Sequence, residues 1–166
     1  ISLSAHRHGQ MLDIVSDDEG PFSPERSGRL PIKNFIKLCA QHDINDIKKM
    51  VRGNGGLVSL LGTNSALEVQ KRIDSGDERA RLVYEAMAYQ IAKSIGELAV
   101  VLDGEVDAIV ITGGIAYSEM ITEYIKKKVS FIAPVKILPG ENELESLAFG
   151  AYRVLTGEEK AHIFAE

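Results

Sequence analysis

The stretch that most restricts the fold of this chain is 106–118, which reads V-D-A-I-V-I-T-G-G-I-A-Y-S. Residues with strand character, Val106–Ile111, run into Thr112-Gly113-Gly114, and a helical pattern begins directly afterwards. Because glycine has no Cβ, a ligand can approach the backbone N–H groups of such a turn, and the following helix adds the positive end of its dipole. The pattern predicts a buried strand followed either by a phosphate- or nucleotide-binding turn or by a tight connection alone.

A long amphipathic helix is predicted just before this strand, over about 77–102. Ser75, with Glu78 three residues later, resembles a capping box that would begin the helix. Apolar residues recur at intervals of three and four, so one face is expected to be buried as a structural scaffold. That face consists of Ala80, Val83, Tyr84, Met87, Ile91, Ile95, Leu98 and Leu102.

The remaining elements indicate an α/β domain. Residues 1–7 and 10–16 suit two antiparallel strands, with His8-Gly9 as a two-residue turn between them. Further helices are expected over 33–41, 44–52, 64–74, 118–128 and 142–155, and a further strand over 135–138. This order predicts a mixed sheet that contains an N-terminal antiparallel hairpin and is covered by packed helices.

Length, charge and cysteine content exclude several functional classes. The chain has 166 residues, enough for one domain with a proper core, and a formal net charge of -5, which makes nucleic acid and anionic membranes poor partners. Cys39 is the only cysteine, so no intrachain disulfide can form and a cytoplasmic location is expected. No apolar run reaches the roughly 18–20 residues of a membrane-spanning helix. Ile1 opens directly in strand-like sequence, and we therefore expect a longer parent protein.

A rigid loop that presents one arginine is a second candidate for chemistry. The segment 19–28, E-G-P-F-S-P-E-R-S-G, holds two prolines and two glycines around Arg26. A guanidinium group offers a planar fork of donors to phosphoryl oxygens, so the loop suits phosphoryl recognition. An arginine that pairs with a nearby carboxylate in a purely structural loop fits the sequence equally well.

Two further segments are candidates for a ligand site. Glu141, Glu143 and Glu145 surround the expected start of the last helix, where they would either stabilise the helix N-terminus or help to hold Mg²⁺. Magnesium typically takes one or two carboxylates together with substrate phosphates. The segments 53–56, G-N-G-G, and 61–64, L-G-T-N, could line a nucleotide pocket or serve as ordinary loop and cap residues.

Taken together and in this order, these segments resemble the C-terminal half of acetate kinase family members of the butyrate kinase type. The likeness covers nearly the whole chain. It rests on A-H-R-H-G at 5–9, G-P-F-S-P-E-R-S-G at 20–28, Y-E-A-M-A-Y-Q-I-A-K at 84–93, the stretch 106–118, S-F-I-A-P-V at 130–135 and P-G-E-N-E-L-E-S-L-A at 139–148. The resemblance implies that 1–166 is the C-terminal, nucleotide-binding domain of a two-domain kinase with an actin-like, ribonuclease H-like core. It also implies an N-terminal domain that supplies the carboxylate-binding groups, and a homo-oligomer.

The resemblance implies a reversible transfer of a phosphoryl group from ATP to butyrate, giving butyryl phosphate and ADP, with Mg²⁺. Arg26 would stabilise the transferring phosphoryl group. Glu143, which follows Asn142, would be the magnesium-associated glutamate, with Glu141 or Glu145 as alternatives. Segment 114–118 would line the adenosine side of the nucleotide site. The nucleotide-binding residues expected in all are Gly62, Asn64, Gly113, Gly114, Ile115, Ala116, Tyr117 and Ser118.

Two departures from the family pattern bear on specificity. Where acetate kinases carry Asp-x-Arg at the nucleotide site, this chain has Ser65-Ala66-Leu67. The loop before Arg26 is shorter than in acetate kinases, which favours butyrate, while acetate, propionate and isobutyrate remain alternative substrates. A non-catalytic actin-like nucleotide-binding module is the alternative from another functional class, and it would keep Gly113-Gly114 without needing a rigid arginine loop. Without its partner domain, 1–166 is expected to be inactive.

Overall fold

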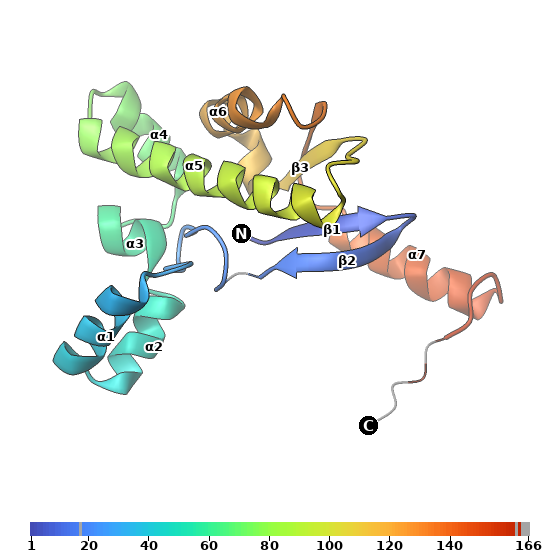
Figure 1. Cartoon of the computed structure of the whole chain (residues 1–166), viewed down its shortest axis with the longest axis horizontal. Helices are drawn as coiled ribbons and strands as arrows, with labels where there is room; N and C mark the ends of the chain where they lie inside the picture. Colours follow the sequence, from blue (N-terminus) through green and yellow to red (C-terminus); the bar gives the residue numbers. More distant parts are fainter. Residues whose placement is uncertain (17, 162, 164–166) are drawn as a thin grey trace.

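A computed structural model describes residues 1–16, 18–161 and 163. Figure 1 shows the longest helix crossing the molecule, two short helices together at one end and the last helix extending from the other. Among the described helices, none combines the length and the apolar character needed to span a bilayer. The elements, in chain order, are β1 (Leu3–Arg7), β2 (Gln10–Val15), α1 (Ile32–Gln41), α2 (Ile44–Val51), α3 (Gly56–Leu61), α4 (Ala66–Asp74), α5 (Glu78–Val101), β3 (Ile109–Gly113), the 3-10 turn η1 (Gly114–Tyr117), α6 (Glu119–Val129), β4 (Val135–Pro139) and α7 (Glu143–Leu155).

The expected hairpin is confirmed. β1 and β2 pair antiparallel, and the chain reverses at His8 and Gly9, whose φ angles are 53° and 77°. Positive φ at both central residues is the geometry of a type I′ turn, which matches the right-handed twist of the flanking strands. Ala5, with 4% of its surface exposed, is where β1 enters the core.

The strands of the described residues form two separate pairs rather than one hydrogen-bonded sheet. β1 pairs with β2, and β3 pairs with β4 in parallel, with Ile109 opposite Val135. The α/β class, the N-terminal hairpin and the packed helices are therefore as expected. The mixed sheet is interrupted between β1 and β3, because no described strand joins these two edges.

Helix α5 forms the centre of the core, as its periodicity predicts. It packs against α6, α4, β1 and β2, and its buried residues share one hydrophobic cluster with Ile109 and Ile111 of β3. Val83 and Ile95 pack against the same cluster while remaining partly exposed. The fully buried large side chains of this cluster include Tyr84, Met87, Ile121, Ile125, Val129, Val69 and Leu57.

The predicted capping box of α5 is wrong. Asp77 is the N-cap, and its Oδ1 accepts a hydrogen bond from the Ala80 N–H at 2.9 Å. Ser75 instead ends α4, where its hydroxyl donates to the Lys71 carbonyl at 2.9 Å. Gly76, with φ of 93°, separates the two helices, and the residue after it, Asp77, caps α5.

Candidate functional site

The turn after β3 has a backbone that only glycine adopts readily. Gly113 has φ of 76° and ψ of -170°, a region closed to residues with a Cβ. Its N–H donates to the Gly140 carbonyl at 3.0 Å, and the Thr112 hydroxyl donates to the same carbonyl at 3.2 Å. Gly113 at the end of β3 is thus tied to Gly140, which directly follows β4. Gly114 then begins the turn η1, and Ser118 accepts from the Ile121 N–H as the N-cap of α6.

The acidic start of α7 lies against this turn. A Cβ built on Gly113 would stand 3.8 Å from Glu141 Oε1, and one built on Gly140 would stand 3.2 Å from the Tyr117 hydroxyl. Asn142 makes no side-chain capping hydrogen bond with α7. Two segments that lie about 30 positions apart in the printed sequence therefore meet at one edge of the β3-β4 pair.

A cavity of about 1250 Å³ opens at this edge and continues between β1 and β3. It brings together the predicted Gly113, Gly114, Ile115 and Glu143. Glu141 also lines it, whereas Glu145 does not, which favours Glu141 and Glu143 over Glu145 as cation-facing groups.

Three other residues expected at the nucleotide site do not line this cavity. Ala116 is packed in the hydrophobic core at 5% exposure, Tyr117 is 72% exposed, and Ser118 caps α6. None of these three lines the cavity. A 3-10 turn has three residues per turn, so successive side chains point in different directions and do not all face the cavity.

The arginine loop, defined as residues 20–29, is folded on itself and bonded to α3 and α5. Within the loop, the Ser23 N–H donates to the Arg26 carbonyl at 3.0 Å and the Arg29 N–H donates to the Gly20 carbonyl at 2.8 Å. The Phe22 N–H donates to Gln90 Oε1 of α5 at 3.0 Å. The loop therefore presents Arg26 from a backbone with a defined shape.

Helix α3 begins on this loop. No side chain caps α3, and its Leu57 and Val58 N–H groups donate to the Ser23 and Pro24 carbonyls at 3.1 and 3.0 Å. The first N–H groups of a helix lack partners within it, and the loop carbonyls here supply them. The sequence gives no periodic signal for this helix, because it has only six residues between two glycine-rich turns.

The glycine segment 53–56 packs on the arginine loop. The Glu25 carbonyl accepts hydrogen bonds from the Gly53 and Gly55 N–H groups at 2.8 and 3.1 Å. A Cβ on Gly56 would overlap the Ser23 carbonyl oxygen and stand 2.7 Å from the Arg26 carbonyl oxygen. The absence of a side chain at this segment lets two backbones touch, so these glycines act on the shape of the arginine loop.

Asn64 also belongs to the surroundings of the arginine loop. Its Nδ2 donates to Glu25 Oε1 at 2.6 Å, next to Arg26 in the chain. Ile1 and Pro24 line the large cavity, whereas Arg26, Asn64 and Gly62 do not. Arg26 is half-buried and near the end of the cavity where Ile1 lies.

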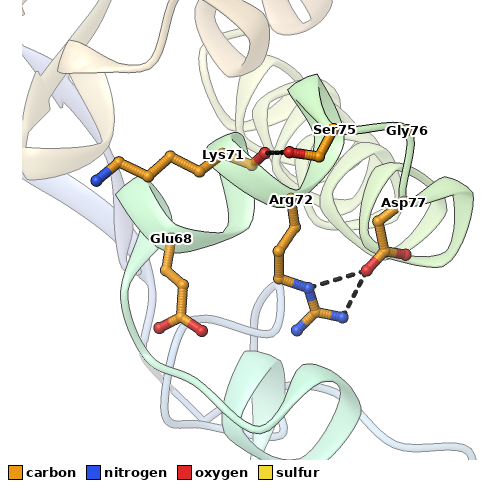
Figure 2. A pocket seen from close by; sticks show the side chains of 6 residues that line it. All are labelled: Glu68, Lys71, Arg72, Ser75, Gly76 and Asp77. Atoms are coloured by element: carbon orange, nitrogen blue, oxygen red, sulfur yellow. Dashed lines mark hydrogen bonds and ion pairs between the residues drawn. The ribbon is translucent and has the colours of Figure 1, made fainter.

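A second hollow, of about 490 Å³, lies where α4 meets α5 (Figure 2). Arg72 points at Asp77 and donates to its Oδ2 from Nε at 2.9 Å and from Nη2 at 2.7 Å. The Ala80 N–H first, and the Arg72 hydrogen bond second, lower the pKa of Asp77. Arg72 also donates to the Leu61 carbonyl at 2.8 Å. Arg72 and Asp77 pair with each other, so their charges are not offered to a ligand. We therefore interpret the hollow as the contact between α4 and α5 and not as a binding site.

The residues at Ser65-Ala66-Leu67 have local roles in α4. The Ser65 hydroxyl accepts from the Glu68 N–H at 3.2 Å as the N-cap, and Leu67 is 66% exposed. Ala66 lines the large cavity. A serine and an exposed leucine carry no charge, so this segment offers a nucleotide no ion pair.

The start of α7 suits a magnesium ion that binds mainly through substrate. Among the described residues, no group of three or more histidine, cysteine, aspartate or glutamate side chains could hold a metal alone. Glu141 and Glu143 both line the cavity. Mg²⁺ usually keeps several waters and binds one or two carboxylates plus substrate phosphates. The two carboxylates of Glu141 and Glu143 fit this coordination.

Solved structures identify the fold of this chain. The crystal structure of acetate kinase from Porphyromonas gingivalis matches with a TM-score of 0.81 and 22% identity, covering 93% of this chain and 46% of that one. A propionate kinase from Francisella tularensis matches with a TM-score of 0.74 and 22% identity, covering 86% of this chain and 44% of that one. The fold is the actin-like ATPase fold of these kinases, as expected from the sequence.

The chain belongs to the acetokinase family, whose sequence profile matches residues 2–161. It is 50% identical over 165 residues to the protein named butyrate kinase 2 of Clostridium acetobutylicum, an alignment that covers 97% of this chain and 46% of that protein. The chain thus spans about half the length of the curated relatives it matches. The resemblance inferred from the motifs is confirmed.

Proposed function

We propose that the parent protein is an ATP-dependent carboxylate kinase that forms butyryl phosphate and ADP from butyrate and ATP, reversibly. Residues 1–166 would be its C-terminal, nucleotide-binding domain. An N-terminal domain of the same chain would hold the carboxylate. The 50% identity to a protein named butyrate kinase 2 supports butyrate over acetate, propionate or isobutyrate. The parent protein would be a homo-oligomer in the cytoplasm, where the exposed free thiol of Cys39 suits the reducing conditions.

One observation carries this proposal. A single cavity is lined by the Gly113-Gly114 turn, by Glu141 and Glu143, and by Pro24 of the arginine loop. Backbone N–H groups, carboxylates and a nearby guanidinium group are the parts that phosphoryl transfer needs, because its catalysis rests on positioning and charge stabilisation. A site that only bound a nucleotide would not need an arginine loop whose backbone is held by hydrogen bonds to α3 and α5.

The reaction assigns one task to each part. A butyrate oxygen attacks the γ-phosphorus in line, a new P–O bond forms, the bond to the β-phosphate oxygen breaks, and ADP leaves with that electron pair. Arg26 would donate to the equatorial oxygens of the transferring group, where charge is concentrated. Gly113 and Gly114 would let the nucleotide approach the backbone closely. Glu141 and Glu143 would hold Mg²⁺, which supplies further charge neutralisation when bound.

The test is acyl phosphate formation by the complete parent protein with ATP, Mg²⁺ and each of the four carboxylates, trapped as the hydroxamate. The Arg26→Ala variant is expected to lose about 10²–10³-fold in kcat, the cost of removing one preorganised donor to a developing oxyanion. Arg81→Ala, which removes an exposed arginine on α5, serves as the matched control and is expected to keep normal turnover.

The outcomes separate the two functional classes. Turnover with butyrate that falls in Arg26→Ala and is retained in Arg81→Ala supports the proposal. ATP binding without turnover on any of the four acids would favour a nucleotide-binding module. Near-normal kcat in Arg26→Ala would show that Arg26 has no role in the reaction. The kinase function would then be decided by turnover on the four carboxylates alone.

A further inference from the structure

The arginine loop is attached to helix α5 near both of its ends. Close to its start, the Phe22 N–H donates to Gln90 Oε1 at 3.0 Å. At its end, Arg29 donates from Nη1 and Nη2 to the two carboxylate oxygens of Glu97 at 2.6 and 2.8 Å. Gln90 and Glu97 are seven positions apart on α5, which is about two helical turns, so they lie on the same side of the helix. One side of one helix therefore holds both ends of the loop.

The two attachments differ in burial. Phe22 is 7% exposed, its neighbour Ser23 is 4% exposed, and Gln90 is half-buried, whereas Arg29 and Glu97 are both exposed. A buried backbone N–H that loses its partner bears the full desolvation penalty of that group. An exposed ion pair contributes little, because water and salt screen it. The hydrogen bond to Gln90 is therefore the stronger of the two attachments.

A short path of backbone contacts connects Gln90 to Arg26. The Ser23 N–H, one peptide beyond Phe22, donates to the Arg26 carbonyl at 3.0 Å. On the other side of Arg26, a Cβ built on Gly28 would stand 2.5 Å from the Phe22 nitrogen, so the two halves of the loop touch at this peptide. A displacement of the Phe22 peptide consequently moves the backbone on both sides of Arg26.

Helix α5 also supports the glycine turn at the other part of the candidate site. Its buried residues share one hydrophobic cluster with Ile109 and Ile111 of β3, the strand that ends at Gly113. The arginine loop and the Gly113-Gly114 turn are thus both fixed to the same helix. The position of Arg26 relative to this turn depends on how firmly the loop is held on α5.

We propose that Gln90 is a positioning residue, which holds the Phe22 peptide on α5 so that the Arg26 guanidinium group meets the transferring phosphoryl group. This inference rests on the proposed phosphoryl transfer. Gln90 does not line the large cavity, so it acts through the loop and not by touching the substrates. A displacement of about 1 Å at a group that acts on the reacting atoms can cost about 10²-fold in rate.

Substitution of Gln90 in the complete parent protein tests this role. Gln90→Met removes the acceptor and keeps a long, helix-favouring side chain, whereas Gln90→Glu restores an acceptor at the same place. Gln70→Met is the matched control, because Gln70 is another half-buried helical glutamine, and its Nε2 donates to Asp74 of its own helix at 2.9 Å. We expect kcat to fall about 10–10²-fold in Gln90→Met, with the KM values for ATP and butyrate changed by less than about threefold. Gln90→Glu and Gln70→Met should stay within about threefold of the parent kcat.

Two further measurements distinguish positioning from a general loss of stability. The double variant Arg26→Ala/Gln90→Met should stay within about threefold of the kcat of Arg26→Ala, because a residue that acts only through Arg26 has nothing left to lose without it. Amide hydrogen exchange at Phe22 and Ser23, resolved to single residues, should be about tenfold or more faster in Gln90→Met than in Gln70→Met.

Three results would overturn the inference. The first is a parental kcat in Gln90→Met, and the second is a double variant that shows the full product of the two single losses. The third is unchanged exchange at Phe22 and Ser23 in Gln90→Met. A parent protein without turnover on any carboxylate would instead contradict the proposed function, and amide exchange would still decide whether Gln90 holds the arginine loop.

Discussion

Replacing Gly56 by alanine should distort the arginine loop, because a methyl group at this position has no space. Gly56 has φ of 58°, and a Cβ there would overlap the Ser23 carbonyl oxygen and stand 2.7 Å from the Arg26 carbonyl oxygen. These neighbours are backbone atoms, which move only if the loop moves. Gly104→Ala is the matched control, since Gly104 has φ of 77° and no atom within 4 Å of its Cβ position.

The control separates the two contributions to the free energy of unfolding. Alanine in the left-handed region costs about 1–2 kcal/mol at either position. At Gly56 the overlap adds about 1–3 kcal/mol, the usual cost of forcing extra atoms into a packed site. Gly56→Ala should therefore unfold about 2–12 °C below Gly104→Ala, at about 2–4 °C per kcal/mol for a domain of this size.

Thermal unfolding of the complete protein, followed by circular dichroism, measures this difference, and acyl phosphate formation measures its effect at Arg26. We expect a lower kcat for Gly56→Ala than for Gly104→Ala, because the displaced Ser23 and Arg26 carbonyls belong to the loop that presents the guanidinium group. Equal unfolding temperatures for the two variants would refute the reasoning that the segment 53–56 fixes the shape of this loop.

Three further outcomes can be measured in the complete protein. The hydrogen bond from Arg29 lowers the pKa of Glu97, so the stabilisation from this exposed pair, about 0.5–1 kcal/mol, is present above the ordinary glutamate pKa and is lost as the pH falls through the depressed one. Urea unfolding of Glu97→Gln should differ from the parent at neutral pH and converge with it as the pH falls below the depressed pKa. Burial raises the pKa of the Tyr84 hydroxyl and the nearby Ser118 side chain lowers it, but no hydrogen bond of good geometry reaches this hydroxyl among the described residues, so Tyr84→Phe should not lower the urea midpoint, and a loss above about 1 kcal/mol would show that Ser118 is a true partner. Glu143→Gln should raise the Mg²⁺ concentration for half-maximal rate by about tenfold or more, whereas Glu145→Gln should not, and equal effects would contradict the assignment.

The long helix shows what periodicity can and cannot predict. Apolar spacing placed it at 77–102, and the structure has it at Glu78–Val101 with the expected face buried. Its N-cap was missed because both Ser75 and Asp77 are good capping residues, and the choice depends on Gly76 adopting φ of 93°. The strand expected from Val106 begins at Ile109, since only there does β4 offer hydrogen-bond partners.

The candidate site divides in the same way. The Gly113-Gly114 turn and the acidic start of α7 were predicted from local composition, and the structure places both on one cavity. The contact between the segment 53–56 and the arginine loop was not predicted, because it depends on two backbones about 30 positions apart approaching without side chains between them. Ala116 lies in the core since the 3-10 turn directs its side chain inward.

The start of α3 on the arginine loop gives the two segments a shared stability. The Leu57 and Val58 amides remain bonded only while Ser23 and Pro24 hold their places, so opening the loop also unpairs the first turn of the helix. Any ligand that orders Arg26 must then slow hydrogen exchange at Leu57, a fully buried residue that the ligand never touches. The amide of a core leucine thus becomes a reporter of occupancy at the arginine.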